Sequence, residues 1–277
     1  MTTRNLMRLL LVMVAALTSP IIRGAAPAAT VDTITISSAL LPQPMKITVA
    51  APCEVPAEGC PTLYLLNGHG GDYRNWPKIL PVDSIAAHYG MVIVCPSGMN
   101  SWYWDSPADS TMRMESFITN ELVAAIDSLY PTRPQREYRA VTGLSMGGHG
   151  ALWLALNHPD LFGSAGSTSG GVDIRPFPKS WNMARYLGER DENPEVWNNH
   201  TVTNFVDKLA AANLNIIIDC GYDDFFYEVN CELDRKLNEA KIPHAFITGP
   251  GGHTFAYWQK SIYPQLDFFA RKFGIMK

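Results

Sequence analysis

The stretch Gly143-Leu144-Ser145-Met146-Gly147 constrains this chain more than any other. It fits the Gly-x-Ser-x-Gly turn that joins a buried strand to a helix and carries a serine at its tip. The flanking sequence supplies both neighbours, since Tyr138–Thr142 reads as a short strand and the apolar run after Gly148 predicts a helix ending near His158-Pro159. Glycines beside the serine let backbone pass where a β-carbon would obstruct it. This context predicts a nucleophile elbow at Ser145 rather than an ordinary turn with an incidental serine.

An elbow of this kind predicts an acid and then a histidine, each after a later strand. Leu214–Asp219 is a β-branched run that leads into a turn with two carboxylates, Asp223 and Asp224. His244–Thr248 reads as the next strand, and a glycine-rich loop with His253 follows it. Among the seven histidines, His253 alone lies in such a loop beyond the acid. The order therefore predicts a Ser-Asp-His triad in which His253 is the base.

The rest of the chain alternates strand and helix patterns without internal repeats. This predicts an α/β fold with a mostly parallel central sheet and helices on both faces. Thr33–Ser37 and Met45–Ala50 are expected to enter it as an antiparallel pair, and Met91–Cys95 and Gly163–Ser167 read as further strands. Two stripes at helical spacing read as core: Ile118, Leu122, Ile126 and Leu129, and then Trp258, Ile262, Leu266, Phe269 and Phe273.

The segment from Gly171 to Leu209 breaks this alternation. It follows a predicted strand and is rich in aromatic residues, so we expect a small cap-like insertion, about 171–209, over the serine. Aromatic side chains in such a cap can receive an acyl group or a sugar, and Trp181 is the candidate substrate contact. Packing within the insertion is the alternative role for most of these aromatics.

Five motifs, taken in order, resemble the esterase D-like family of α/β-hydrolases from about Thr62 to the C-terminus. They are Leu65–Gly71, Ser101–Pro107, Gly143–Gly148, Asp219–Asp224 and Gly252-His253. That family includes feruloyl and acetyl-xylan esterases, tributyrin esterases, S-formylglutathione hydrolases and mycolyltransferases. The resemblance implies the α/β-hydrolase fold and an acyl-enzyme mechanism. A glycine-rich loop could instead cradle phosphate, but neither a P-loop nor a dinucleotide pattern follows, so no cofactor is expected.

The resemblance also selects among the candidate site residues. It implies that the second of the two adjacent acids, Asp224, is the triad member. The elbow itself makes the backbone N–H of Met146 one donor to the oxyanion, and the resemblance implies the backbone N–H of His69 as the second. Two positions depart from the family pattern. Asn67 stands where relatives usually have histidine, and His149 where they often have an aromatic residue.

The N-terminus reads as a secretion signal. Residues 1–29 have a basic start, the apolar run Leu9–Leu17, and Ala26-Pro27-Ala28 as a cleavage site. The apolar run is shorter than the roughly 20 residues that a membrane-spanning helix needs. Residues 30–277 are expected to form a single esterase domain. The chain is therefore expected to be secreted or periplasmic.

The charge and the spacing of the cysteines limit the binding partners, metal sites and disulfides that we expect. The formal net charge is −4, it becomes more negative when the basic N-terminus is removed, and no block of Lys and Arg occurs. Nucleic acid and anionic membranes are therefore not expected partners. Cysteine and histidine spacings fit no metal site. In an oxidising compartment Cys53 and Cys60 are the favoured disulfide, and Cys220 with Cys231 is a second possible pair. Cys95 is expected to be a buried free thiol. The alternative is that all five cysteines are reduced and serve as small apolar residues.

These features predict a secreted serine carboxylic-ester hydrolase. The resemblance favours acyl esters of carbohydrates, of the acetyl or feruloyl type, or small acyl esters as substrates. An acyltransferase or thioesterase would share the same acyl-enzyme and differ in the acceptor that reaches it. From another class, a non-catalytic carbohydrate-binding module could use the same fold. The acyl and alcohol specificities and the oligomeric state are left open by the sequence.

Overall fold

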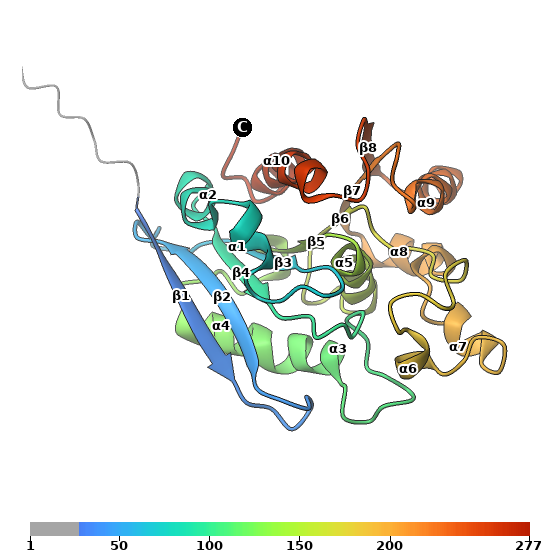
Figure 1. Cartoon of the computed structure of the whole chain (residues 1–277). Helices are drawn as coiled ribbons and strands as arrows, with labels where there is room; N and C mark the ends of the chain where they lie inside the picture. The colour runs from blue at the N-terminus through green and yellow to red at the C-terminus, as the bar shows by residue number, and fades with distance from the viewer. Residues whose placement is uncertain (1–27) are drawn as a thin grey trace, which may run out of the picture.

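The computed structural model describes residues 28–277. Residues 1–27 of the predicted signal peptide lie outside the described residues. A single eight-stranded sheet crosses the described part of the chain in the order β1-β2-β4-β3-β5-β6-β7-β8 (Figure 1). The strands are β1 (Ala29–Ile36), β2 (Met45–Pro52), β3 (Thr62–Leu66), β4 (Val92–Pro96), β5 (Arg139–Gly143), β6 (Ser164–Thr168), β7 (Asn215–Gly221) and β8 (His244–Gly249).

The sheet is mostly parallel, as the alternation of patterns predicted. β1 pairs with β2 and β2 with β4 in antiparallel fashion, and every other neighbouring pair from β4 to β8 is parallel. The antiparallel entry is confirmed, although β1 begins at Ala29 rather than Thr33 because its ladder with β2 extends to Pro52. β5 continues to Gly143, which pairs with Leu66. That pairing brings the elbow against the end of β3.

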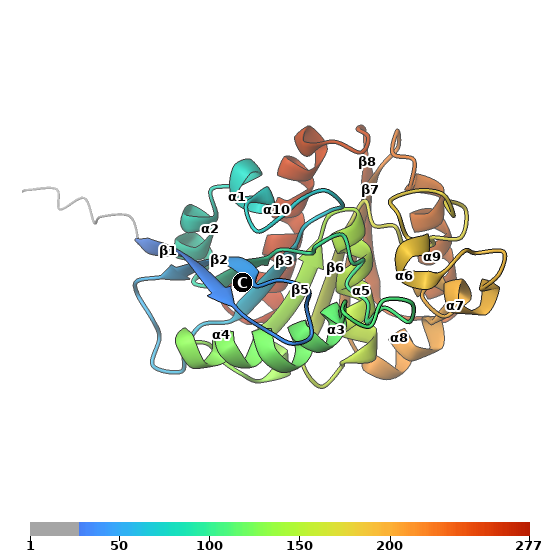
Figure 2. The ribbon, with the colours of Figure 1, turned by 60° about the horizontal axis from the view of Figure 1, so that its bottom comes forward.

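Helices cover both faces of the sheet (Figure 2). They are α1 (Asn75–Ile79), α2 (Val82–Tyr89), α3 (Met114–Ser116), the π-helical η1 (Phe117–Leu122), α4 (Val123–Leu129), η2 (Arg136–Tyr138), α5 (Met146–Asn157), α6 (Ala184–Leu187), α7 (Pro194–Asn198), η3 (Val202–Asn204), α8 (Val206–Ala212), α9 (Tyr227–Glu239) and α10 (Phe255–Lys272). One apolar core includes residues of α4, α5, α8 and α9, and a second includes residues of α2 and α10.

Strand β3 shows why the fold has two cores. Tyr64 and Leu66 point into the first core, whereas Leu63 and Leu65 point into the second. All four are fully buried. A strand covered on both faces needs apolar residues at consecutive positions instead of an alternating pattern. The predicted helical stripes also lie in these cores, since Ile118, Leu122 and Ile126 are buried in one and Ile262, Leu266 and Phe269 in the other. Leu129, the last residue of the first stripe, is 62% exposed.

The segment expected to form the cap contains α6, α7 and η3, and it merges into α8. Two of its aromatics are packing residues. Trp197 is fully buried and its Nε1–H donates to the carbonyl oxygen of Gly188 at 2.9 Å, and Tyr186 is also buried. Trp181 differs from them because it has a left-handed backbone, with φ 50°, and is only partly buried.

The predicted disulfide between Cys53 and Cys60 is wrong, because all five cysteines are free thiols in the structure. Cys53 is exposed at a strand end, whereas Cys60 is buried, and its backbone is bonded to Pro131 and Arg133. The second pair, Cys220 and Cys231, is likewise unbonded. Cys95 is buried and free, as expected.

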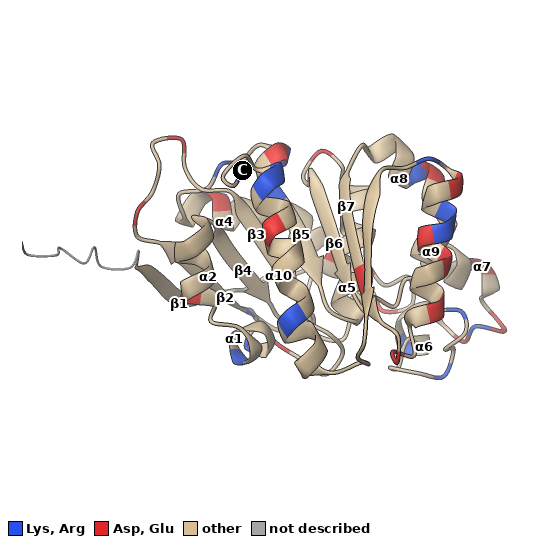
Figure 3. Cartoon of the chain, turned by 90° about the horizontal axis from the view of Figure 1, so that it is seen from above, with Lys and Arg blue, Asp and Glu red and all other residues tan. Residues whose placement is uncertain are grey.

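Charged residues of both signs occur along helix α9. Figure 3 shows Lys and Arg beside Asp and Glu along α9. There Arg235 pairs with Glu232 and Glu239. Among residues 28–277, no helix combines the length and the apolar character required to cross a bilayer.

Candidate active site

Ser145 occupies a strained turn between β5 and α5. Its backbone has φ 57° and ψ −118°, a left-handed conformation that is costly for a residue with a β-carbon. Close backbone approach fixes the turn. A β-carbon on Gly147 would lie 2.3 Å from the carbonyl oxygen of Leu66, and one on Gly143 would lie 2.6 Å from the same atom. The strand, turn and helix expected around Ser145 are therefore present, and the flanking glycines are sterically required.

The two predicted partners of Ser145 meet it in space. His253 Nε2 lies 2.8 Å from Ser145 Oγ, and His253 Nδ1 lies 2.9 and 3.0 Å from the two carboxylate oxygens of Asp224. A carboxylate can only accept, so Nδ1 carries the proton and Nε2 accepts from the serine hydroxyl. Asp224 follows β7, His253 follows β8, and Ser145 follows β5. The parallel strands thus deliver all three groups to one edge of the sheet.

Of the two adjacent acids, Asp224 rather than Asp223 faces the histidine. The Asp224 side chain is fully buried, and its Oδ1 also accepts the backbone N–H of Phe226 at 2.9 Å. Asp223 is exposed to solvent. The choice between them made from the family resemblance agrees with this geometry.

Two backbone N–H groups beside Ser145 are free. Neither the N–H of Met146, at the first position of α5, nor that of His69 donates to an acceptor within residues 28–277. The loop that contains His69 lies against the elbow, since a β-carbon on Gly68 would lie 3.2 Å from Ser145 Cβ. Both proposed donors therefore flank the serine. Desolvation lowers the pKa of the His69 imidazole, partly offset by a hydrogen bond to the backbone of Trp181.

A cavity of about 510 Å³ opens above the serine. Its lining combines the loop that contains His69, the elbow, the loop that contains His253 with the start of α10, and the predicted cap: Gly68, His69, Gly70, Gly71, Asn75, Leu144, Ser145, Trp181, His253, Thr254, Phe255 and Trp258. Trp181 thus lies at the cavity, as proposed from the sequence. It also stacks on Phe225, with ring centroids 5.7 Å apart. Trp181 combines a place in the cavity wall with packing contacts.

Two aromatic residues that the sequence reasoning missed hold the histidine ring. The ring centroids of Phe225 and His253 lie 4.2 Å apart, although Phe225 is 50% exposed. Trp258 meets the same ring edge-on at 4.8 Å, and its Nε1–H donates to Ser169 Oγ at 3.1 Å. Phe225 directly follows Asp224 in the sequence, which is a local signal for it. The helical stripe in the sequence predicts Trp258 in the core, and Trp258 is indeed buried.

His149, one of the two departures from the family pattern, is a structural residue of the helix after the elbow. It is fully buried, and burial lowers its pKa to about 3. Its Nε2 accepts the Nε1–H of Trp104 at 2.9 Å, so Nδ1 carries the proton and donates to the carbonyl oxygen of Gly171 at 3.0 Å. Neutral His149 therefore ties α5 to the start of the predicted cap.

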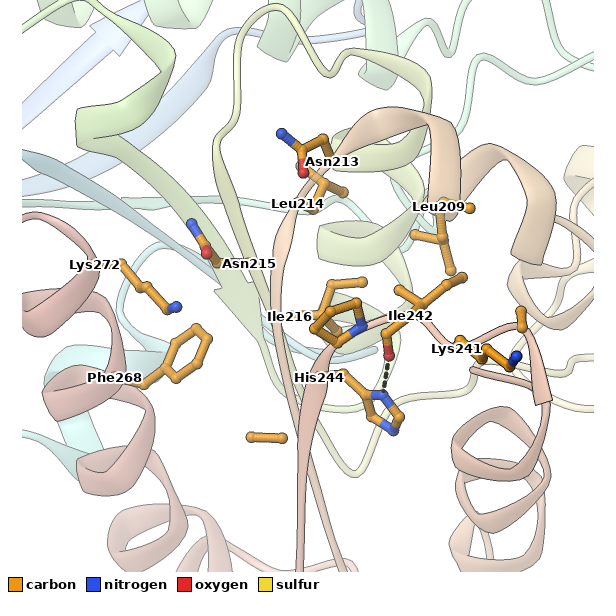
Figure 4. Close-up of a pocket in the computed structure, with 14 residues that line it drawn as sticks. Leu209, Asn213, Leu214, Asn215, Ile216, Lys241, Ile242, His244, Phe268 and Lys272 are labelled. Atoms are coloured by element: carbon orange, nitrogen blue, oxygen red, sulfur yellow. Dashed lines mark hydrogen bonds between the residues drawn. The ribbon is translucent and has the colours of Figure 1, made fainter. Parts of the chain in front are cut away.

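A second cavity, of about 450 Å³, lies at the opposite ends of β7 and β8 (Figure 4). Leu209, Ile216 and Phe268 contribute its apolar surface, and His244 turns its Nδ1–H toward the carbonyl oxygen of Ile242 at 2.8 Å. None of the residues that line it is a serine, cysteine or acid. Within residues 28–277, no group of three or more His, Cys, Asp or Glu side chains is arranged to hold a metal ion.

Comparison with known proteins gives consistent matches. Residues 37–269 match the family model Esterase, described as "Putative esterase". The chain is 28% identical to an acetyl esterase of Caldicellulosiruptor saccharolyticus, and the match covers 79% of this chain and 86% of that protein. It is 30% identical to an S-formylglutathione hydrolase of Mus musculus, and that match covers 76% of this chain and 82% of the relative. A solved ferulic acid esterase superposes with a TM-score of 0.75 at 28% identity, covering 88% of this chain and 99% of its own.

Proposed function

The chain belongs to the Esterase family and has the α/β-hydrolase fold, and from that premise we propose that it is a serine carboxylic-ester hydrolase acting through an acyl-enzyme. One observation carries the proposal. A continuous line of hydrogen bonds runs from buried Asp224 through His253 to Ser145, whose hydroxyl faces a cavity. Ser145 is the proposed nucleophile, His253 the base, and Asp224 the group that orients the imidazole.

Each group has a defined task in the proposed reaction. Ser145 Oγ attacks the ester carbonyl while His253 Nε2 takes the hydroxyl proton, and the C–O bond to the alcohol breaks as the same proton passes to the leaving oxygen. Water then attacks the acyl-serine, again losing a proton to His253, which returns it to Ser145 as the acid leaves. The free N–H groups of Met146 and His69 stabilise the negative oxygen of both tetrahedral intermediates. The N-terminal end of α5 adds its dipole at the same place.

The proposed substrates are small acyl esters and acyl esters of carbohydrates, of the acetyl or feruloyl type. The cavity supports this because aromatic side chains, Trp181, Phe255 and Trp258, line it next to the serine. Flat apolar walls suit an acyl group or the face of a sugar. The similar proteins named acetyl esterase and ferulic acid esterase favour the same class.

We further propose export from the cytoplasm, on the basis of the signal-like residues 1–29. Expression in a bacterial host with N-terminal sequencing of the product tests this. A mature chain that begins at Ala29 is the expected result, and retention of Met1 in the cytosolic fraction would contradict export.

Nucleophile replacement tests the proposed activity. Ser145→Ala should lower turnover of p-nitrophenyl acetate by about 10⁴-fold or more, because triad members act as a unit. Ser37→Ala, which changes an exposed serine, is the matched control and should behave as wild type. A serine-directed phosphonate should label Ser145 alone in mass spectrometry. Full activity in Ser145→Ala, or labelling at another serine, would exclude the proposal, and binding of esters without turnover would favour a non-catalytic module.

A further inference from the structure

The segment Gly98–Tyr103 contacts the oxyanion loop, Asn67–Gly71, through several hydrogen bonds. Asn100 Oδ1 accepts the backbone N–H of Gly70 at 2.6 Å. Tyr103 Oη donates to the carbonyl oxygen of Asn67 at 3.0 Å. In return, the Asn67 side chain accepts the N–H of Gly98 at 2.8 Å through Oδ1 and donates to Gly68 O at 2.8 Å through Nδ2. Three of these four bonds join the two segments, whose bonded residues are 30 to 36 positions apart in the sequence, and the fourth lies within the loop.

The contacting segment is held in a costly conformation. Four of its non-glycine residues have left-handed backbones: Met99 (φ 49°), Asn100 (φ 59°), Trp102 (φ 56°) and Tyr103 (φ 64°). Residues in this region cost free energy unless surrounding contacts over-determine them, and they concentrate at functional sites. Ser101 provides two of the contacts that hold this backbone, since its hydroxyl donates to the carbonyl oxygen of Gly98 and accepts the N–H of Tyr103. This backbone conformation places Asn100 and Tyr103 in hydrogen-bonding contact with the oxyanion loop.

The bond from Asn100 determines which backbone donor of that loop remains free. The N–H of Gly71 donates to Gly68 O at 3.1 Å, which closes a turn with His69 and Gly70 at its centre. Gly70 has φ 77°, the value that the third residue of a type II turn requires. The two central N–H groups are outside the turn's own hydrogen bond. Asn100 accepts the N–H of Gly70, so of these two central N–H groups only that of His69, a residue of the cavity wall, has no acceptor among the described residues.

We propose that Gly98–Tyr103 is a brace that fixes the oxyanion loop, with Asn100 as its positioning residue and Asn67 and Tyr103 as its anchors. The inference rests on the proposed esterase function, because it concerns the donor at His69. Asn100 touches no reacting atom. It acts by occupying the neighbouring N–H and thereby holding the turn in the orientation that presents the His69 N–H to the developing oxyanion.

A structural role alone predicts a different result for loss of the Asn100 side chain. Asn100 is only partly buried and makes a single side-chain hydrogen bond, to the oxyanion loop. If it served stability alone, its loss would lower the melting temperature and leave the kinetic constants unchanged. If it positions a transition-state donor, kcat falls whereas KM, which reports the neutral ester, stays nearly constant.

Asn100→Gly is the informative variant, because glycine adopts a left-handed backbone without strain and lacks the acceptor. Asn213→Gly is the matched control. Asn213 is also left-handed, with φ 49°, but it follows α8 at the far end of the parallel strands. Removing an oxyanion donor outright costs about 10²–10³-fold in kcat. Loss of its positioning residue is expected to cost about 10- to 100-fold in kcat for p-nitrophenyl acetate, with KM changed less than about threefold.

Amide hydrogen exchange provides a readout independent of activity. The Gly70 N–H should be protected in wild type and in Asn213→Gly and should exchange faster in Asn100→Gly. If Asn100→Gly fails to fold, Tyr103→Phe replaces it, since it removes only the hydroxyl that anchors Asn67. A fall of about fivefold in kcat is expected there, the factor of one ordinary hydrogen bond.

The outcomes separate this inference from the proposed function. Ser145-dependent turnover in wild type, with kcat of Asn100→Gly within twofold of Asn213→Gly, would overturn the brace and leave the esterase intact. In the fallback case, unchanged kcat in Tyr103→Phe would do the same. Absence of Ser145-dependent turnover in the wild type would remove the proposed function and this inference with it.

Discussion

Asp219 gives a stability prediction whose size follows from its burial. It ends the apolar run of β7, beside Thr168 of the neighbouring strand β6, and has no exposed surface. Its Oδ2 accepts from Thr168 Oγ1 and from Gln265 Nε2, both at 2.5 Å, whereas Oδ1 has no partner among the described residues. Gln265 also accepts from Thr142. One buried carboxyl therefore links β6, β7 and α10, and through Gln265 also β5.

Burial raises the pKa of Asp219 from an ordinary 3.8 to about 6, although the hydrogen bonds from Thr168 and Gln265 oppose the rise. Because the folded pKa lies above the unfolded one, the folded protein holds the proton more tightly between these values. The free energy of unfolding contributed by Asp219 is fully present below about pH 4 and is lost as the pH rises through about 6. The rise of the pKa from 3.8 to about 6 corresponds to about 3 kcal/mol.

Urea denaturation of wild type and Asp219→Asn at pH values from about 4 to 8 measures this loss, because the amide does not titrate. The difference in unfolding free energy, wild type minus variant, should decrease by about 3 kcal/mol across the interval. Asp160→Asn, which removes an exposed carboxylate, controls for the change in net charge. A difference that stays constant with pH for Asp219→Asn, or one that rises, would refute the assignment of a buried carboxyl held protonated in weak acid.

The remaining predictions concern the site itself. Asp224→Asn should reduce kcat for p-nitrophenyl acetate by about 10⁴-fold because the amide favours the wrong imidazole tautomer, whereas exposed Asp223→Asn should stay close to wild type; the reverse order would assign the acid to the wrong residue. Gly147→Ala should lower both the melting temperature and the extent of phosphonate labelling, because the new methyl group would lie 2.3 Å from the carbonyl oxygen of Leu66 in β3. Gly249→Ala is the control and should change neither, because its methyl group would have no atom within 4 Å. Trp181→Ala should change the ratio of kcat/KM between a feruloyl ester and p-nitrophenyl acetate by about 3- to 10-fold; an unchanged ratio with a lower melting temperature would make Trp181 a packing residue.

The parts of the site that were predictable from sequence have local signals. Ser145 stands in a five-residue motif between a strand and a helix, and Asp224 and His253 follow two apolar strands. Parallel strands place their following loops at one edge of the sheet, so chain order alone brings these residues together. The fold was predictable for the same reason, since consecutive apolar residues such as Leu63–Leu66 indicate a strand buried on both faces.

The wrong disulfide shows where local signals end. Cys53 and Cys60 flank a short loop with proline and glycine, and sequence proximity suggested a bond. A disulfide also requires the two side chains to point toward each other. Cys60 instead turns into the first core while its backbone joins Pro131 and Arg133, and Cys53 remains at the surface. The direction of a side chain at a strand end depends on partners far along the chain.

The catalytic residues of this site could be predicted from local sequence, whereas the residues that position the oxyanion loop could not. The nucleophile, acid and base lie at the ends of three parallel strands, whose relative positions the sheet fixes. The oxyanion loop depends on Asn100 and Tyr103, whose bonds to Gly70 and Asn67 span 30 and 36 positions in the sequence and need left-handed backbones at residues that are not glycine. No pattern of hydrophobicity or turn residues indicates such bonds. Reaction type can therefore be inferred from a few motifs, whereas the precision with which the transition state is held depends on contacts that only the three-dimensional structure reveals.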